Sequence, residues 1–210
     1  AVKKAGRKNE LAYQLAKKGK ELRMDLEYIM VGAPQAKLTR SSSVAGLTGN
    51  IFSYYTTNGS MGAGAGVAPI GDGSNTGTAG TPRALTETLI LTASQKIWEN
   101  GGKANTIHCG VKQKNLISTT FKGRATQIQT DASNSKVSST VDVYETDWGM
   151  YKIVPNRHIA ASVVFMFDPS MHSINYLRAF QQYPLAKTGD SEKRQLLAEY
   201  TLRVNNEKSG

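Results

Sequence analysis

The sequence is poor in the residues on which most small secreted proteins and metalloproteins depend. It contains one cysteine, Cys109, among 210 residues, which excludes an internal disulfide framework and the common four-ligand zinc patterns. No apolar run reaches about 18 residues, so we expect no membrane span. The first residues lack an apolar signal segment, so the sequence offers no reason to expect secretion.

Residues that could carry out catalysis or hold a cofactor are equally scarce. The glycine-rich run at 62–66 is not followed by Lys-Ser or Lys-Thr, so it is not a phosphate-binding Walker motif. His108 and Cys109 are neighbours in a predicted strand, where side chains alternate between faces, so they cannot converge on one metal or substrate. Three acids are spaced unevenly and are more typical of a solvated face or of pairing with arginine across subunits: Asp142, Glu145 and Asp147. We therefore predict that the protein is not an enzyme and has no cofactor and no metal site.

What the sequence does have is positive charge, concentrated at its beginning. The formal net charge is +10, and residues 1–23 hold eight cations against Glu10 and Glu21, so +6 of the excess lies there. Such a balance fits contact with a polyanion. It fits a solvated basic helix equally well, and charge alone does not choose between the two.

The clearest helix is predicted over residues 7–31. Its apolar positions recur every three or four residues, with Gly19 in the intermediate turn. These positions are Leu11, Leu15, Leu22, Leu26 and Ile29. Gly32 and Pro34 then end the helix. About 25 residues at ~1.5 Å each make a rod of about 37 Å, which either crosses the whole subunit or packs against a neighbour.

The segment after this helix is rich in turn-forming residues. A short strand is possible at 50–57, ended by an Asn58-Gly59 turn. Residues 59–80 hold eight glycines and cannot bury enough apolar surface to fix one conformation alone. We predict an extended or mobile surface loop there, packed poorly against its own domain.

The middle of the chain is typical of a sheet flanked by helices. Thr86 is a plausible N-cap of a second helix, which Gly101-Gly102 ends. A short strand over Thr106–Cys109 leads to a third helix of about ten residues, whose apolar positions are Leu116, Ile117 and Phe121.

From Val137 onward the apolar period changes to two, which indicates strands. A hairpin is predicted around Asp147-Trp148-Gly149, with residues 150–154 as the returning strand. The nearly continuous apolar run at 162–167 favours a strand covered on both faces. Alternation over residues 195–205, which only Leu197 interrupts, predicts a long, half-buried final strand.

Four blocks in this order carry a resemblance over essentially the whole chain. They are Ala5–Gln14 with Glu21-Leu22 and Asp25–Glu27; Leu85–Leu89 with Gln95–Trp98 and Gly101-Gly102; Asp147–Gly149 with Val154–Arg157; and Ala186–Asp190 with Glu199–Leu202 and Asn205-Asn206. In this order and spacing they resemble the major capsid proteins of tailed bacteriophages with the Johnson fold, most closely those of the podophage-type family.

The resemblance implies an α+β fold with a long spine helix, a peripheral domain, and an axial domain of mixed sheet flanked by helices. The implied divisions are 1–50 for the spine helix of the peripheral domain and the following segment, 51–83 for the glycine-rich loop, 84–170 for the axial domain, and 171–210 for a return segment and a long C-terminal strand that packs with the peripheral domain. Family members usually carry an N-terminal arm and an extended hairpin loop before the spine helix. This sequence starts almost at the helix, so we expect that its beginning was cleaved or is missing.

The function that the resemblance implies is that of a major capsid protein, which self-assembles into the icosahedral head shell of a tailed double-stranded DNA phage. The implied partners are further copies of the chain, in pentamers and hexamers, with scaffolding, portal and decoration proteins and non-specifically bound DNA, and no membrane. We expect the protein in the virion capsid, assembled in the cytoplasm of the bacterial host. Two alternatives stay open: a monomeric basic nucleic-acid-binding protein, and an encapsulin-like nanocompartment shell.

Two groups of residues are candidates for these roles. The residues expected to face the lumen and its DNA are Lys3, Lys4, Arg7, Lys8, Lys17 and Lys18. The residues expected to define the fold or to lie at subunit interfaces are Trp148, Gly149, Asn156, Arg157, Gly189 and Asp190.

Overall fold

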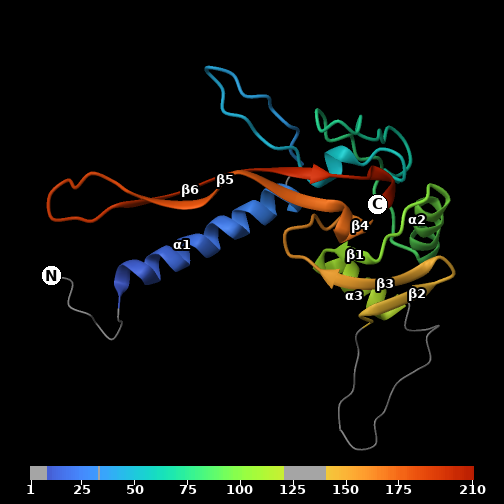
Figure 1. The fold of residues 1–210 in the computed structure, drawn as a ribbon. Helices are drawn as coiled ribbons and strands as arrows, with labels where there is room; N and C mark the ends of the chain where they lie inside the picture. Colours follow the sequence, from blue (N-terminus) through green and yellow to red (C-terminus); the bar gives the residue numbers. More distant parts are fainter. Residues whose placement is uncertain (1–8, 33, 121–140) are drawn as a thin grey trace, which may run out of the picture.

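The computed structural model describes residues 9–32, 34–120 and 141–210. The chain has a mixed α+β architecture with two parts (Figure 1). One part is a four-stranded sheet with two helices, and the other is a long helix that runs beside an extended two-stranded hairpin. Within the described ranges, no helix is long and apolar enough to cross a membrane.

The long helix is α1, Glu10–Glu27, and it continues without a break as a π-helical turn over Tyr28–Gly32. Asn9 caps its start, because its side-chain oxygen accepts a hydrogen bond from the backbone N–H of Ala12 at 3.3 Å. The predicted end at Gly32 is confirmed. The predicted start at residue 7 lies outside the described residues.

The strand predicted over residues 50–57 is wrong, because this segment contains a 3-10 helix, Ile51–Tyr54. The side chain of Asn50 accepts a hydrogen bond from the backbone N–H of Phe52 at 2.8 Å, and the Ser53 hydroxyl donates to the Asn50 carbonyl at 2.6 Å. These local bonds compete with strand pairing for the same backbone groups. Both side chains are fully buried, so the turn is part of the packed structure.

The glycine-rich segment at 59–80 forms an irregular loop with two isolated bridges, Ala63 to Thr81 and Val67 to Thr78. Val67 and Ile70 are 59% and 69% exposed. No residue of this segment belongs to the two hydrophobic clusters formed by the described residues. The segment is held by backbone bridges and by polar contacts such as the Lys37–Asp72 ion pair at 3.6 Å, and it contributes little to the apolar core.

The sheet part follows the predicted order of elements closely. Helix α2 is Glu87–Glu99 with Thr86 at its N-cap, strand β1 is Thr106–Cys109, and α3 is Val111–Thr120. Strands β2 (Val143–Thr146) and β3 (Gly149–Pro155) form the predicted hairpin, and β4 (Val164–Phe167) completes a sheet of order β2-β3-β1-β4. Strand β1 runs parallel to β3, whereas the other two pairings are antiparallel. Val137 and Phe121, which the sequence assigned to a strand and to α3, lie outside the described residues.

Strand β4 joins two hydrophobic clusters, because alternate side chains of a strand point to opposite faces. Met166 belongs to the first cluster, in which α2, α3 and the inner face of the sheet meet around Ile107. Phe165 and Phe167 belong to the second, with Leu26 of α1 and Leu202 of the final strand. All three β4 side chains are buried, as the continuous apolar run predicted. The second cluster therefore connects α1 and the hairpin to the sheet.

The hairpin consists of β5, His172–Pro184, and β6, Arg194–Val204. Strand β6 was predicted from its alternation and is confirmed. Strand β5 was not predicted as a strand. Its pairing with β6 shifts register between Tyr176 and Arg178 and again between Arg178 and Gln181, and such bulges interrupt the period of two that sequence analysis depends on.

Candidate assembly surfaces

The described residues show no arrangement suited to catalysis. Cys109 is buried in the first cluster, and its burial raises the pKa of its thiol. His108 points to the other face of the sheet and packs edge-on against Phe167, with ring centroids 4.9 Å apart, and burial lowers the pKa of its imidazole. The described residues contain no group of three or more His, Cys, Asp or Glu that could hold a metal ion. The surfaces of the molecule are therefore the candidates for its function.

The junction between α1 and the sheet contains one of the predicted residues, Asn156. Its side-chain amide donates to the Glu27 carboxylate at 2.8 Å, its side-chain oxygen accepts from the backbone N–H of His158 at 2.8 Å, and its backbone N–H donates to the Cys109 carbonyl at 2.9 Å. Asn156 is only 9% exposed. The side chain of Asn156 therefore links the end of α1 to the turn after β3, and its backbone N–H adds the end of β1. The neighbouring Arg157 is exposed and takes no part in this link.

The other predicted interface residues lie in two turns far from this junction. Trp148 and Gly149 stand at the turn between β2 and β3, where the Trp148 backbone N–H donates to the Thr146 hydroxyl oxygen at 3.3 Å. Gly189 and Asp190 lie at the tip of the β5–β6 hairpin. Gly189 has a φ of +78°, a conformation that L-residues with a side chain rarely adopt. The six residues therefore mark three separate places and not one surface.

The candidate basic residues also separate. Lys3, Lys4, Arg7 and Lys8 lie outside the described residues. Lys17 is exposed, and the helical spacing puts it on the face of α1 opposite the apolar stripe. Lys18 stands beside the stripe and forms an ion pair with Glu21 at 2.6 Å. That hydrogen bond raises the pKa of Lys18 and lowers the pKa of Glu21.

The face of α1 that carries Lys17 combines cations with large apolar side chains. Tyr13, Met24 and Tyr28 share this face by their spacing and are 41%, 50% and 51% exposed. Lys20 is exposed on the same side. A surface of this composition can contact phosphates through its lysines and a protein surface through its apolar residues.

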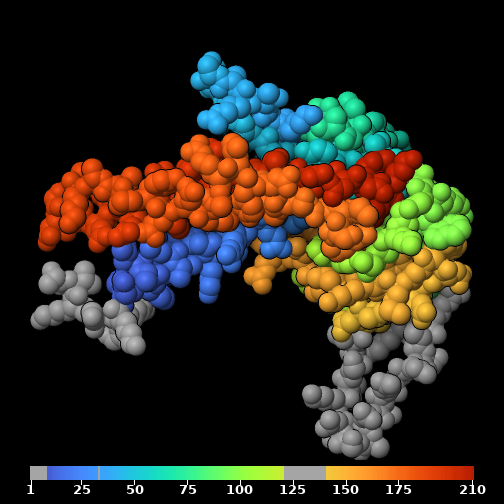
Figure 2. Space-filling view, viewed as in Figure 1, coloured from blue at the N-terminus to red at the C-terminus, as the bar shows by residue number. Residues whose placement is uncertain are grey.

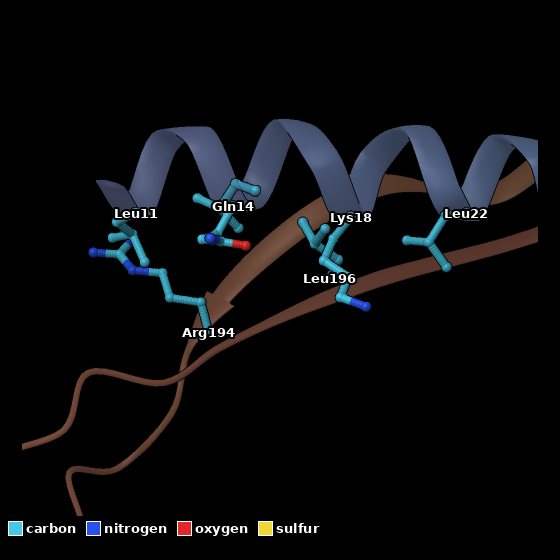
Figure 3. Close-up of a pocket in the computed structure, with 7 residues that line it drawn as sticks. Leu11, Gln14, Lys18, Leu22, Arg194 and Leu196 are labelled. Carbon is cyan, nitrogen blue, oxygen red and sulfur yellow. The ribbon is translucent and has the colours of Figure 1, made fainter. Parts of the chain in front are cut away.

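A groove of about 360 Å³ separates the first turns of α1 from β6. Leu11, Leu15 and Leu22 of the helix and Leu196 of the strand line it. In Figure 3 the side chains of Leu11 and Leu22 project from the helix toward the hairpin. Polar ends of Gln14, Lys18 and Arg194 border the groove. The apolar stripe of α1 therefore faces the hairpin, with its outer half loosely packed and its inner end, at Leu26, buried in the second cluster.

The C-terminal residues are attached to residues 56–58 by hydrogen bonds that sequence analysis missed. The Glu207 carboxylate accepts hydrogen bonds from the backbone N–H groups of Thr56 and Thr57, both at 3.3 Å, and from the Thr57 hydroxyl. The Asn58 amide donates to the carbonyls of Lys208 and Gly210. No local sequence pattern predicts contacts between segments about 150 residues apart. They hold the loop after the 3-10 helix against the base of the hairpin.

Comparison with known proteins supplies a further finding. A family model described as the SU10 major capsid protein matches residues 1–210 of the chain. No curated protein matches the sequence.

Proposed function

Because the chain belongs to the SU10 major capsid protein family, whose members form the shell of a viral head, we propose that it builds the icosahedral head of a tailed bacteriophage around double-stranded DNA. A phage major capsid protein is a structural, non-enzymatic component of the virion capsid. The finer claims, namely the icosahedral geometry, its pentamers and hexamers, and the enclosed DNA, are our proposal.

The observation that carries this proposal is the elongated arm formed by α1 and the hairpin. In Figure 1 these two elements extend side by side well beyond the sheet part. In Figure 2 the arm stands clear of the rest of the described chain on the face shown. Within one chain, an arm of this length with a half-open apolar groove buries only part of its apolar surface. Neighbouring copies can bury the rest. Closed symmetry then makes many modest interfaces collectively stable.

We propose further that this is the Johnson fold of podophage-type capsid proteins. In this assignment α1 is the spine helix of the peripheral domain within 1–50, and residues 51–83 are a surface loop. The sheet with α2 and α3, within 84–170, is the axial domain around five- and six-fold axes. Residues 171–210 return along the spine. The support is the contact between α1 and β6 and the link of both to the sheet through Phe165 and Phe167.

The proposed role of the basic residues is to reduce repulsion from packaged phosphates without reading sequence. The net charge of +10 and the exposed Lys17 on the face of α1 opposite the apolar stripe support it. Lys18 is a weaker contributor, because Glu21 neutralises it. Scaffolding, portal and decoration proteins are further proposed partners.

Light scattering on the purified full-length protein, followed by nuclease treatment, tests the proposal against its alternatives. A phage shell requires megadalton particles that protect DNA from nuclease when isolated from infected cells. An encapsulin-like shell would form particles that hold a protein cargo instead of DNA. A monomeric nucleic-acid-binding protein would stay small and would bind DNA with a steep salt dependence.

A further inference from the structure

Strand β5 carries the densest group of exposed apolar side chains in the part of the chain that the structure describes. Of the 19 large hydrophobic residues that are exposed, six lie within residues 174–185. Five of them belong to β5, and Leu185 directly follows it: Ile174, Tyr176, Leu177, Phe180, Tyr183 and Leu185. Leu177 is the most exposed of all at 81%. Such a concentration of exposed apolar side chains is typical of an interaction surface.

One edge of β5 is also unpaired among the described residues. The strand is 13 residues long and pairs only with β6. Among the other free sheet edges, those of β2 and β4 belong to strands of four residues each, and that of β6 belongs to a strand of 11 residues. A long free edge exposes a row of backbone N–H and C=O groups, and proteins usually protect such edges with lysines or other charges.

Strand β5 lacks this protection. Its only charged residue is Arg178, since His172 is uncharged at neutral pH. The Arg178 guanidinium binds both oxygens of the Glu199 carboxylate, at 2.7 and 2.9 Å. By contrast, β6 carries Arg194, Glu199 and Arg203 and faces α1. The β5 edge is therefore long, apolar and electrically neutral, and Figure 2 shows the hairpin uncovered along its outer half on the visible face.

We propose that the β5 edge pairs with the β5 edge of a second copy of this chain across a two-fold axis. This inference rests on the proposed shell function. A two-fold contact brings each residue near its own counterparts, so like charges would repel. A strand whose one charge is already neutralised meets that condition, and no other described strand combines comparable length with neutrality.

The area that this contact buries indicates whether it can hold two copies together by itself. Thirteen residues at ~3.3 Å each make an edge of about 43 Å, and a sheet thickness of ~10 Å then gives roughly 430 Å² per copy. The total of roughly 860 Å² is below the ~1,200 Å² typical of stable complexes. The β5 contact is therefore too weak to hold an isolated dimer and forms within the shell, where other contacts add to it.

The substitution Leu177→Lys tests this contact, with Ile70→Lys as the matched control. Both replace an exposed aliphatic residue, but Ile70 lies on the glycine-rich loop. At equal concentration we expect L177K to lower the assembled fraction at least about tenfold, with an unfolding midpoint like that of the wild type. The I70K variant should assemble normally. Normal assembly of L177K would overturn the proposal, whereas a wild type that fails to assemble would contradict the shell function itself.

A mixture of L177K with Leu177→Glu shows which segment of the second copy contacts the β5 edge. If β5 meets β5, opposite charges face each other in the mixed contact, and the mixture should recover most of the wild-type assembly although neither variant assembles alone. If β5 instead meets another segment of the second copy, mixing restores nothing, and the two-fold pairing is wrong.

Discussion

At the residue scale, Asn156 is the side chain that connects α1 to the turn after β3. Its side chain serves a carboxylate of α1 and a backbone N–H of the turn after β3 at the same time. Because Asn156 is buried, its removal leaves the half-buried His158 backbone N–H without its hydrogen bond, and it also breaks the bond to the exposed Glu27 carboxylate.

The substitution Asn156→Ala should therefore destabilise the fold by about 1–3 kcal/mol, measured as a lower urea midpoint of the unassembled protein. Arg157→Ala is the control, because Arg157 is exposed and should stay within about 0.5 kcal/mol of the wild type. Equal effects of the two substitutions would show that Asn156 does not link α1 to the sheet.

His172 makes stability depend on pH. Burial lowers the pKa of its imidazole from 6.5, and the ring stacks on Tyr55 and hydrogen-bonds to it. A histidine whose folded-state pKa is depressed contributes stability above its unfolded pKa, and this stability is lost as the pH falls toward the folded pKa. Stability should therefore be level above about pH 6.5 and fall below it.

The variant His172→Gln should show a smaller fall in urea midpoint between about pH 7.5 and pH 5.5 than the wild type. Some dependence should persist, because burial also lowers the pKa of His108. An equal fall of the urea midpoint in the variant and the wild type would show that His172 is not a source of the pH dependence.

At the element scale, α1 is held chiefly at its C-terminal end. Leu26 is 8% exposed and belongs to the second cluster, whereas Met24, on the same helix, is 50% exposed. Leu26→Ala should lower the free energy of unfolding by about 2–5 kcal/mol. Met24→Ala should change it by no more than about 0.5 kcal/mol. Thermal or urea unfolding of both variants provides the comparison. A small effect of L26A would mean that the groove near Leu196, and not the second cluster, holds the helix.

The elements that sequence analysis predicted well are those with an uninterrupted period and a recognisable end. Helix α2 has Thr86 before it, and β4 has three consecutive buried side chains. Strand β5 was missed because its bulges break the alternation, and the 3-10 turn at Ile51–Tyr54 was missed because Asn50 and Ser53 satisfy the backbone locally. The attachment by Glu207 depends on contacts distant in sequence, which no local pattern contains.

At the scale of the whole molecule, the proposed lumen position of Lys17 makes a separate prediction. A bulky amine-reactive reagent that cannot pass the shell should leave Lys17 unmodified in intact particles and modify it after disassembly, as followed by peptide mass spectrometry. The reason is that the face of α1 that carries Lys17 would point toward the DNA. Modification of Lys17 in intact particles would place that face outside.

In the proposed assembly, many copies of this chain close into one shell, with the arm of α1 and the hairpin buried between neighbours. Electron microscopy of particles made by the full-length protein tests this most directly. We predict closed shells with five- and six-fold clusters, in which the sheet part surrounds the axes and the arm contacts adjacent copies. Dispersed single molecules at high protein concentration, or shells in which the arm touches no neighbour, would contradict it.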